Sequence, residues 1–369
     1  MRKFCWLLSF VAVTFTATRP SFAQIVPENI AQNIPDDSRI DTIMADYAQP
    51  GVPGASVAVI KDGQFLHAKG YGLADVEAKV GAMATTNYRL ASLTKQFTAM
   101  AIMILKEQGK ISYDQTITDL LPEFPTYGSK ITIRNLLNHT SGLKDYEDLI
   151  PASTDGQVSD QDVLHLYEAQ SSGDFEPGTQ YRYCNGGYVT LGVIIARLSG
   201  QSYPDFLRDH IFTPLTMANT VAYVNGTNQV SNRAYGYTAD GSTFDRTDQS
   251  VTSATLGDGG IYTSVDEYSK WDAALYGSAL VSQTTLAEAF TSGHLNDGSE
   301  TGYGFGWMLD TYQGVRRIYH TGSSIGFRNA VNRFPDQHLT VIVLINRADA
   351  SPSDLANQIS DLYLSPSAR

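Results

Sequence analysis

The sequence predicts an α+β fold, in which an antiparallel sheet is flanked by N- and C-terminal helices and carries an inserted, mainly helical lobe. The first observation is that runs with strand character gather at the two ends of the chain, at residues 55–60, 64–70, 303–309, 315–320, 326–334 and 339–345. The second is that residues from about 113 to 254 have the patterns of helices and loops. Strands from both ends therefore enclose a helical middle.

The N-terminal part combines a helix with a hairpin. Ile40, Met44 and Tyr47 form an apolar stripe at helical spacing, which predicts a helix beginning near residue 38. The first two strand runs are separated by a loop containing Asp62-Gly63, and an Asp-Gly pair between strands favours a tight turn. We expect these two runs to pair.

The next segment combines an apolar helix with two reactive side chains. Residues 97–105 are almost all apolar, which predicts a helix buried on every side, and Gly109 is a stop signal. Ser92 and Lys95 precede this run, three positions apart, so both side chains emerge on one face. A partly desolvated lysine can lose its proton near neutral pH and activate a hydroxyl. The competing interpretation is an N-capping serine beside a solvated lysine.

Capping and stop signals predict the remaining helices. One helix begins at Thr132 and includes Leu136, and the next begins at a capping pair, Ser159 and Asp162. A third has an apolar stripe from Tyr188 to Leu198 and ends at Gly200, and a fourth has Pro204 in its first turn. A fifth begins at a capping box of Ser264 and Glu267 and ends at Gly277, and a closing helix contains Leu355, Ile359 and Leu362.

The first 23 residues have the pattern of a secretory signal peptide. Arg2 and Lys3 precede an apolar run at residues 4–15, and Ser21-Phe22-Ala23 offers a small-residue cleavage site. We expect a mature chain of residues 24–369 that is periplasmic or secreted. Removing the leader's three positive residues takes the net charge from −12 to −15, which argues against nucleic-acid partners. Cys184 is then the only cysteine, so no intrachain disulfide can form.

Two further stretches carry candidate functional residues. Tyr183-Cys184-Asn185 lies in a loop before a helix, where a tyrosine can transfer a proton and an asparagine can bind a substrate amide. His320-Thr321-Gly322 lies at a strand end, where a carboxylate or amide can be received and glycine leaves room along the edge. Each stretch alone is more often a packing tyrosine or a satisfied histidine.

Together and in this order, the three motifs resemble those of the penicillin-recognising serine hydrolases, which include DD-peptidases, class C β-lactamases, related esterases and D-amino-acid peptidases. Residues 136–142, 176–178, 211–215 and 303–307 also resemble stretches typical of that family. The resemblance implies a β-lactamase/transpeptidase-like fold with one catalytic domain at residues 24–369. Its α/β lobe would comprise about 37–90 and 300–369, and its helical lobe about 91–299.

The resemblance also implies roles for individual residues. Ser92 would be the nucleophile, Lys95 its proton acceptor and Tyr183 the general acid/base. The substrate-binding residues would be Asn185, His320, Thr321, Gly322 and Ser323, with the backbone N–H groups of Ser92 and Ser323 forming the oxyanion hole. His139 matches a loop that looks structural in the family.

Two departures from the family pattern bear on the substrate. His320 stands where class C β-lactamases have lysine, which favours peptide or general acyl substrates over antibiotics. Cys184 stands where serine is common, and we interpret it as a buried small residue.

The sequence therefore predicts an exported acyl-serine hydrolase of D-amino-acid peptides, similar to a DD-carboxypeptidase. A β-lactamase or promiscuous carboxylesterase is the first alternative, and a non-catalytic penicillin-binding or sensor module is the second. The sequence indicates no cofactor and no membrane anchor. It also indicates no metal site, since the seven histidines lack metal-ligand spacing. Residues 322–326 also match Gly-x-Ser-x-Gly, but that motif requires a helix after the serine, and the residues that follow predict a strand. The oligomeric state stays open.

Overall fold

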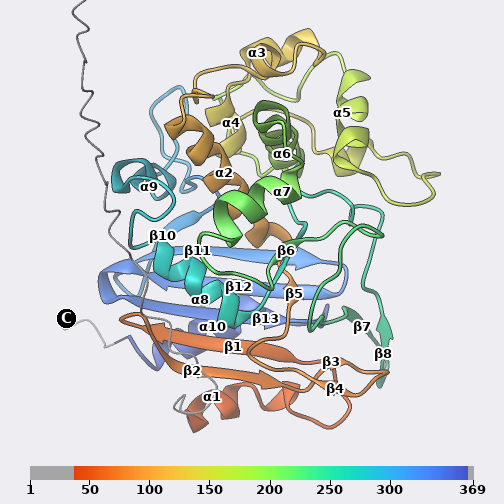
Figure 1. Ribbon diagram of the computed structural model, residues 1–369, viewed down its shortest axis with the longest axis vertical. Coiled ribbons are helices and arrows are strands. Elements are labelled where there is room, and N and C mark those ends of the chain that lie inside the picture. The colour runs from red at the N-terminus through yellow and green to blue at the C-terminus, as the bar shows by residue number, and fades with distance from the viewer. Residues whose placement is uncertain (1–36, 365–369) are drawn as a thin grey trace, which may run out of the picture. The chain divides into compact units, whose positions relative to one another are not determined.

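The computed structural model describes residues 37–364, and its largest sheet joins the two ends of the chain (Figure 1). Its strands run in the order β10-β11-β12-β13-β1-β2, and every neighbouring pair is antiparallel. The junction lies between β1 and β13, where Ala55 pairs with Ile345. The predicted antiparallel sheet is confirmed. Its strands are β1 Ala55–Lys61, β2 Gln64–Tyr71, β10 Met308–Tyr312, β11 Val315–Ser324, β12 Phe327–Phe334 and β13 Leu339–Ile345.

The two faces of this sheet are covered by different parts of the chain. Successive residues of a strand point to opposite faces. Val57 packs in an apolar cluster with α1 (Ser38–Ile43) and α10 (Pro352–Asp361), whereas its neighbour Ala58 packs in a second cluster that includes the helical lobe. The predicted flanking of the sheet by N- and C-terminal helices is therefore confirmed.

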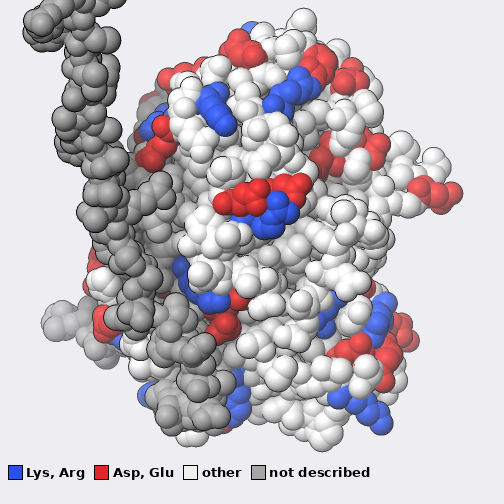
Figure 2. Space-filling view, viewed as in Figure 1, with Lys and Arg blue, Asp and Glu red and all other residues white. Residues whose placement is uncertain are grey.

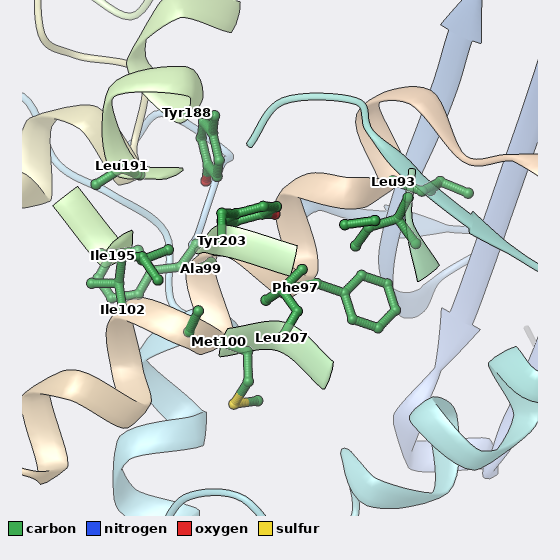
Figure 3. Packing of buried hydrophobic residues seen from close by; sticks show 14 of the residues in the cluster. Leu93, Phe97, Ala99, Met100, Ile102, Tyr188, Leu191, Ile195, Tyr203 and Leu207 are labelled. Atoms are coloured by element: carbon green, nitrogen blue, oxygen red, sulfur yellow. The ribbon is translucent and has the colours of Figure 1, made fainter. Parts of the chain in front are cut away.

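The helical lobe is organised around α2 (Lys95–Glu107). Every residue of α2 from Lys95 to Leu105 is buried, as the apolar run predicted. Figure 3 shows side chains of α2, α6 (Asn185–Ser199) and α7 (Tyr203–Leu207) converging on one cluster, among them Ile102 and Ile195. The other helices are α3 Ile117–Leu120, α4 Ile133–Leu137, α5 Asp160–Glu168, α8 Val265–Ala274 and α9 Gln283–Ala289.

Several short strands were not predicted. Two of these small sheets include strands from residues 113–254, the stretch expected to hold mostly helices and loops. Their pairing is non-local in part, and strands of two to four residues leave little periodicity in the sequence. The first small sheet consists of β5 Tyr88–Arg89, β9 Ile261–Thr263 and β6 Val221–Ala222. The second pairs β3 Leu73–Asp75 with β4 Val80–Gly81, and the third pairs β7 Tyr237–Asp240 with β8 Thr243–Arg246.

The predicted helix caps are largely observed. Ser159 and Asp162 form a reciprocal capping box at α5, as predicted. At α8 the prediction is half right: the Ser264 hydroxyl accepts the Glu267 N–H at 3.1 Å. The Glu267 carboxylate does not return to the cap but accepts from Lys270 Nζ at 2.8 Å instead. Pairing with a nearby cation replaces the expected second half of the box.

The strand predicted at residues 303–309 is wrong in its boundaries. β10 begins only at Met308, and Tyr303 contributes a single bridge to it. The intervening residues form a turn in which Gly306 has φ +79° and lies against α2. A Cβ at Gly306 would lie 2.8 Å from the Lys95 carbonyl oxygen, so this position requires glycine. The turn therefore packs on the start of α2 rather than extending the sheet.

The surface has charges of both signs. On the face shown in Figure 2, Lys and Arg side chains are interspersed with Asp and Glu. On α7 and the residues after it, for example, Arg208 pairs with Asp205 and Asp209. Within residues 37–364, no helix has the length and apolar character needed to cross a bilayer. The predicted signal peptide at residues 1–23 lies outside the described residues.

Candidate active site

Ser92 lies in a strained turn between β5 and α2. Ala91, directly before it, has φ +50°, a conformation that residues with a side chain rarely adopt. Ser92 belongs to a short 3₁₀ helix, Ala91–Thr94, and its side chain caps neither this helix nor α2. The interpretation of Ser92 as an N-cap is therefore excluded.

Gly322 holds this turn against the sheet. A Cβ at Gly322 would lie 2.1 Å from the Leu90 carbonyl oxygen, so a side chain there would push the turn away. Asn329 on the neighbouring strand β12 donates from Nδ2 to the same oxygen at 3.2 Å. Gly322 thus makes room for the protein's own backbone, whereas the sequence suggested that it makes room for substrate.

Lys95 is fully buried and joins the first two motifs. Its Nζ donates to Ser92 Oγ at 3.1 Å and to Asn185 Oδ1 at 2.8 Å. The third hydrogen bond goes to the Asp258 carbonyl oxygen at 3.0 Å. Three acceptors satisfy the three hydrogens of an ammonium group, which compensates for its burial. The nitrogen of Lys95 therefore contacts both the predicted nucleophile, Ser92, and a predicted substrate-binding residue, Asn185.

Asn185 is held by two carboxylates that the sequence did not single out. Its backbone N–H donates to Asp145 Oδ2 at 3.1 Å, and its Nδ2 donates to Glu147 Oε1 at 3.2 Å. Burial raises the pKa of both carboxyl groups. The charges of Asp145 and Asp258 raise the pKa of Glu147 further, and that of Asp258 also raises the pKa of Asp145. The segment carrying them has the composition of a surface loop, so no signal in the sequence pointed to this role.

Tyr183 lies beside the lysine but makes no hydrogen bond to it. Lys95 Nζ is 4.9 Å from the centre of the Tyr183 ring. The Tyr183 hydroxyl is buried and has no hydrogen-bond partner among residues 37–364. The centre of its ring lies 4.2 Å from that of His139, with the planes tilted by 32°, and 6.0 Å from that of His320. The three motifs therefore converge, although the hydroxyl of Tyr183 makes no hydrogen bond to Ser92.

His320 is a neutral, buried side chain. Its Nε2 accepts from the Tyr303 hydroxyl at 3.0 Å when Nδ1 donates to the Thr321 carbonyl at 2.6 Å. Burial and the nearby charge of Lys95 lower the pKa of His320 to about 3. At neutral pH this position offers no positive charge to a substrate carboxylate.

His139 and Cys184 are buried and joined by a hydrogen bond. The backbone N–H of Cys184 donates to His139 Nδ1 at 3.1 Å, which fixes the loop that carries Tyr183 and Asn185. Burial and Lys95 lower the pKa of His139, so the ring stays neutral. Burial raises the pKa of the Cys184 thiol to about 12, as expected for a small residue in the core.

A cleft of about 220 Å³ opens at Ser92. Of the predicted site residues, Ser92, Asn185 and Ser323 line it, while Lys95 contacts two of these three. The other lining residues include Arg89, Tyr146, Glu147, Thr255, Asp258, Gly259 and Ser324.

The cleft lies along a partly unpaired strand. In β11, residues 315–319 pair with β10, whereas His320 to Ser324 pair only with β12. This leaves the end of β11 with one open edge, onto which an extended substrate can add. Ser324 is followed by the strand β12 and not by a helix, so the Gly-x-Ser-x-Gly interpretation is excluded.

Comparison of the chain with known proteins identifies its relatives. A family model described as Beta-lactamase matches residues 37–363. The chain is 34% identical over 309 residues to penicillin-binding protein 4* of Bacillus subtilis (strain 168), which covers 80% of this chain and 68% of that protein.

Two solved structures extend the comparison. The octameric penicillin-binding protein homologue of Pyrococcus abyssi is 27% identical, with a TM-score of 0.76 over 88% of this chain and 76% of that one. The D-amino acid amidase of Ochrobactrum anthropi SV3, in complex with L-phenylalanine amide, is 26% identical, with a TM-score of 0.74 over 88% of this chain and 97% of that one.

Proposed function

The chain belongs to the beta-lactamase family of serine hydrolases, and from this premise we propose that it hydrolyses amide bonds of D-amino-acid peptides through an acyl-enzyme on Ser92. Exported as residues 24–369, it would meet peptides of the cell wall. The relation to a penicillin-binding protein and to a D-amino acid amidase supports this substrate class. His320, which stands where class C β-lactamases have lysine, supports peptides over β-lactams.

The contact between Lys95 and Ser92 carries the proposal. A neutral lysine has two N–H donors and one lone pair. Two of its three partners, Asn185 Oδ1 and the Asp258 carbonyl, can only accept, so they orient both hydrogens. The lone pair is then left for the hydroxyl of Ser92, 3.1 Å away. Lys95 is therefore positioned to take the serine proton as Oγ attacks the substrate carbonyl.

The remaining predicted residues complete the acylation step. The backbone N–H groups of Ser92 and Ser323 would stabilise the oxyanion, and losing one such donor typically costs about 10²–10³ in rate. The open edge of β11, from His320 to Ser324, would bind the extended peptide. Tyr183 stays the predicted proton donor to the leaving group, and this role requires its buried hydroxyl to turn toward the cleft.

A substrate panel tests the proposal. Purified mature protein is given a D-Ala-D-Ala peptide, a D-amino-acid amide, nitrocefin and a short p-nitrophenyl ester, with the Ser92→Ala variant as the blank. We expect the highest kcat/KM on the peptide or the amide. A high rate on nitrocefin alone would favour the β-lactamase alternative, and fast turnover of the ester alone would favour the carboxylesterase. No turnover of any substrate would favour the non-catalytic module.

A further inference from the structure

The side-chain amide of Asn185 can face Lys95 in two ways, and only one of them suits a base. In the structure Oδ1 faces Lys95 and accepts one of its N–H groups at 2.8 Å. Turned end for end, the amide would present Nδ2, which donates, and the lone pair of a neutral Lys95 would accept that hydrogen. The lone pair would then be lost to the hydroxyl of Ser92. A further contact must therefore hold the amide in the observed orientation.

The contacts on the lysine side do not select between the two orientations. A neutral amine has two hydrogens to donate and one lone pair, so it can satisfy either end of an amide. The other two partners of Lys95 are the Asp258 carbonyl, which only accepts, and the Ser92 hydroxyl, which can donate or accept. Both partners can be satisfied whichever way the amide is turned. The choice therefore depends on the groups on the far side of the amide.

The group on the far side is Glu147, in the short 3₁₀ helix Tyr146–Leu149. Its Oε1 accepts from Asn185 Nδ2 at 3.2 Å. An ionised carboxylate has no hydrogen to donate, so a turned amide would lose this bond and bring Oδ1 against a negative oxygen. A hydrogen bond to a charged group shifts an equilibrium by about 10–100-fold. Asp145 accepts only from the backbone N–H of Asn185, so it fixes the start of α6 without selecting the amide orientation.

Protonation of Glu147 would end this selection, because a protonated carboxyl group donates as well as accepts. The charged side chains that line the cleft, among residues 37–364, are Arg89, Glu147 and Asp258. Partial desolvation of the Glu147 carboxyl group, and then the charges of Asp145 and Asp258, raise its pKa, while the charge of Lys95 opposes them. The selection is therefore lost at a higher pH than for an isolated glutamate.

We propose that Glu147 is a positioning residue for acylation, whose carboxylate holds the Asn185 amide so that the lone pair of Lys95 stays available to Ser92. The inference rests on the proposed acyl-enzyme at Ser92. Glu147 touches neither the nucleophile nor the base and acts through Asn185 alone. Its identity as an acceptor, more than its charge, is what the reaction requires.

A substitution series at residue 147 tests this role. The readout is kcat/KM for an activated p-nitrophenyl ester, since kcat/KM in an acyl-enzyme mechanism covers the steps up to acylation. Glu147→Gln can donate or accept, so both amide orientations become populated and kcat/KM should fall by about 2–10-fold. Glu147→Lys can only donate, which selects the turned amide, and kcat/KM should fall by about 10–100-fold.

The matched controls are Asp148→Asn and Asp148→Lys. Asp148 is the adjacent exposed residue of the same short helix, and these variants make the same changes of charge. Because exposed charges interact weakly through water, kcat/KM should stay within about 2-fold of the wild type. Equal effects of Glu147→Lys and Asp148→Lys would show that charge alone matters and would overturn the inference.

The pH dependence separates positioning from a purely structural role. A protonated Glu147 resembles glutamine, so the ratio of kcat/KM between the wild type and Glu147→Gln should fall toward 1 as the pH drops through the pKa of Glu147. A ratio that is the same at every pH would overturn the inference, and this result decides even if Glu147→Lys does not fold. A wild type that no substrate acylates overturns the proposed function and the inference with it. An acylated wild type with a flat series at residue 147 overturns the inference alone.

Discussion

The two faces of the main sheet differ in what they bury. The face covered by α1 and α10 packs an apolar cluster that includes Val57, Val343 and Ile359. The other side, at the start of α2, buries polar atoms that have no partner among residues 37–364, including Tyr183 Oη, His139 Nε2 and Asp258 Oδ1. Native proteins leave few such atoms, because each costs free energy. The α1 and α10 side therefore serves stability, whereas the other side packs an apolar cluster around the helical lobe and also holds the reactive groups.

Replacing Lys95 tests the reactive region most severely. In Lys95→Met we expect kcat/KM to fall by about 10²–10⁴-fold, because the proton acceptor is lost. The free energy of unfolding should change by less than about 2 kcal/mol, since removing a buried charge offsets the lost hydrogen bonds. Steady-state kinetics and urea unfolding measure the two effects. A large loss of stability with unchanged activity would contradict the assignment.

Replacing Ile359 tests the stabilising region. This residue of α10 is fully buried in the apolar cluster. Ile359→Ala should lower the free energy of unfolding by about 2–5 kcal/mol, through lost burial and a cavity. At a temperature where the variant is folded, kcat/KM should equal that of the wild type. A fall in kcat/KM with unchanged stability would mean that the two faces are not functionally separate.

Acidification should give the smallest of the three effects, and it acts on the reactive region through the protonation of His320. Because burial lowers the pKa of His320 to about 3 from its usual 6.5, the unfolded chain binds a proton between these values that the folded chain does not. The free energy of unfolding therefore falls as the pH drops below about 6.5, by up to about 1.4 kcal/mol per pH unit for this group. Chemical unfolding between pH 4.5 and 6.5 should show a shallower fall in His320→Gln. Parallel curves would contradict a neutral, buried His320.

The sequence was informative where structure is local. The last strand along the chain, Leu339–Ile345, has its predicted bounds, because a short apolar run between turn signals determines it. The capping box of Ser159 and Asp162 was predicted because its residues are three positions apart. Ser92, Lys95 and Asn185 were predicted because their residue types and order match a known pattern.

The rest depended on contacts between distant positions. Asp258 lies far along the chain from Lys95, in a glycine-rich segment with no catalytic signature, and only the fold brings its carbonyl to Nζ. Glu147 is an exposed residue in a loop, and only the structure brings it into contact with Asn185. Gly306 broke the predicted strand because α2 packs against it. The roles of these three residues depend on which distant residues the fold brings next to them, and residue type alone does not reveal that.

Mapping a covalent adduct tests the central claim most directly. The protein is treated with a fluorescent penicillin or a fluorophosphonate, digested, and the modified peptide is identified by mass spectrometry. We predict a single adduct on Ser92 that disappears in Ser92→Ala and persists in Ser269→Ala, a serine on α8. An adduct on Ser324, or none on the folded protein, would contradict the assignment of Ser92 as the nucleophile.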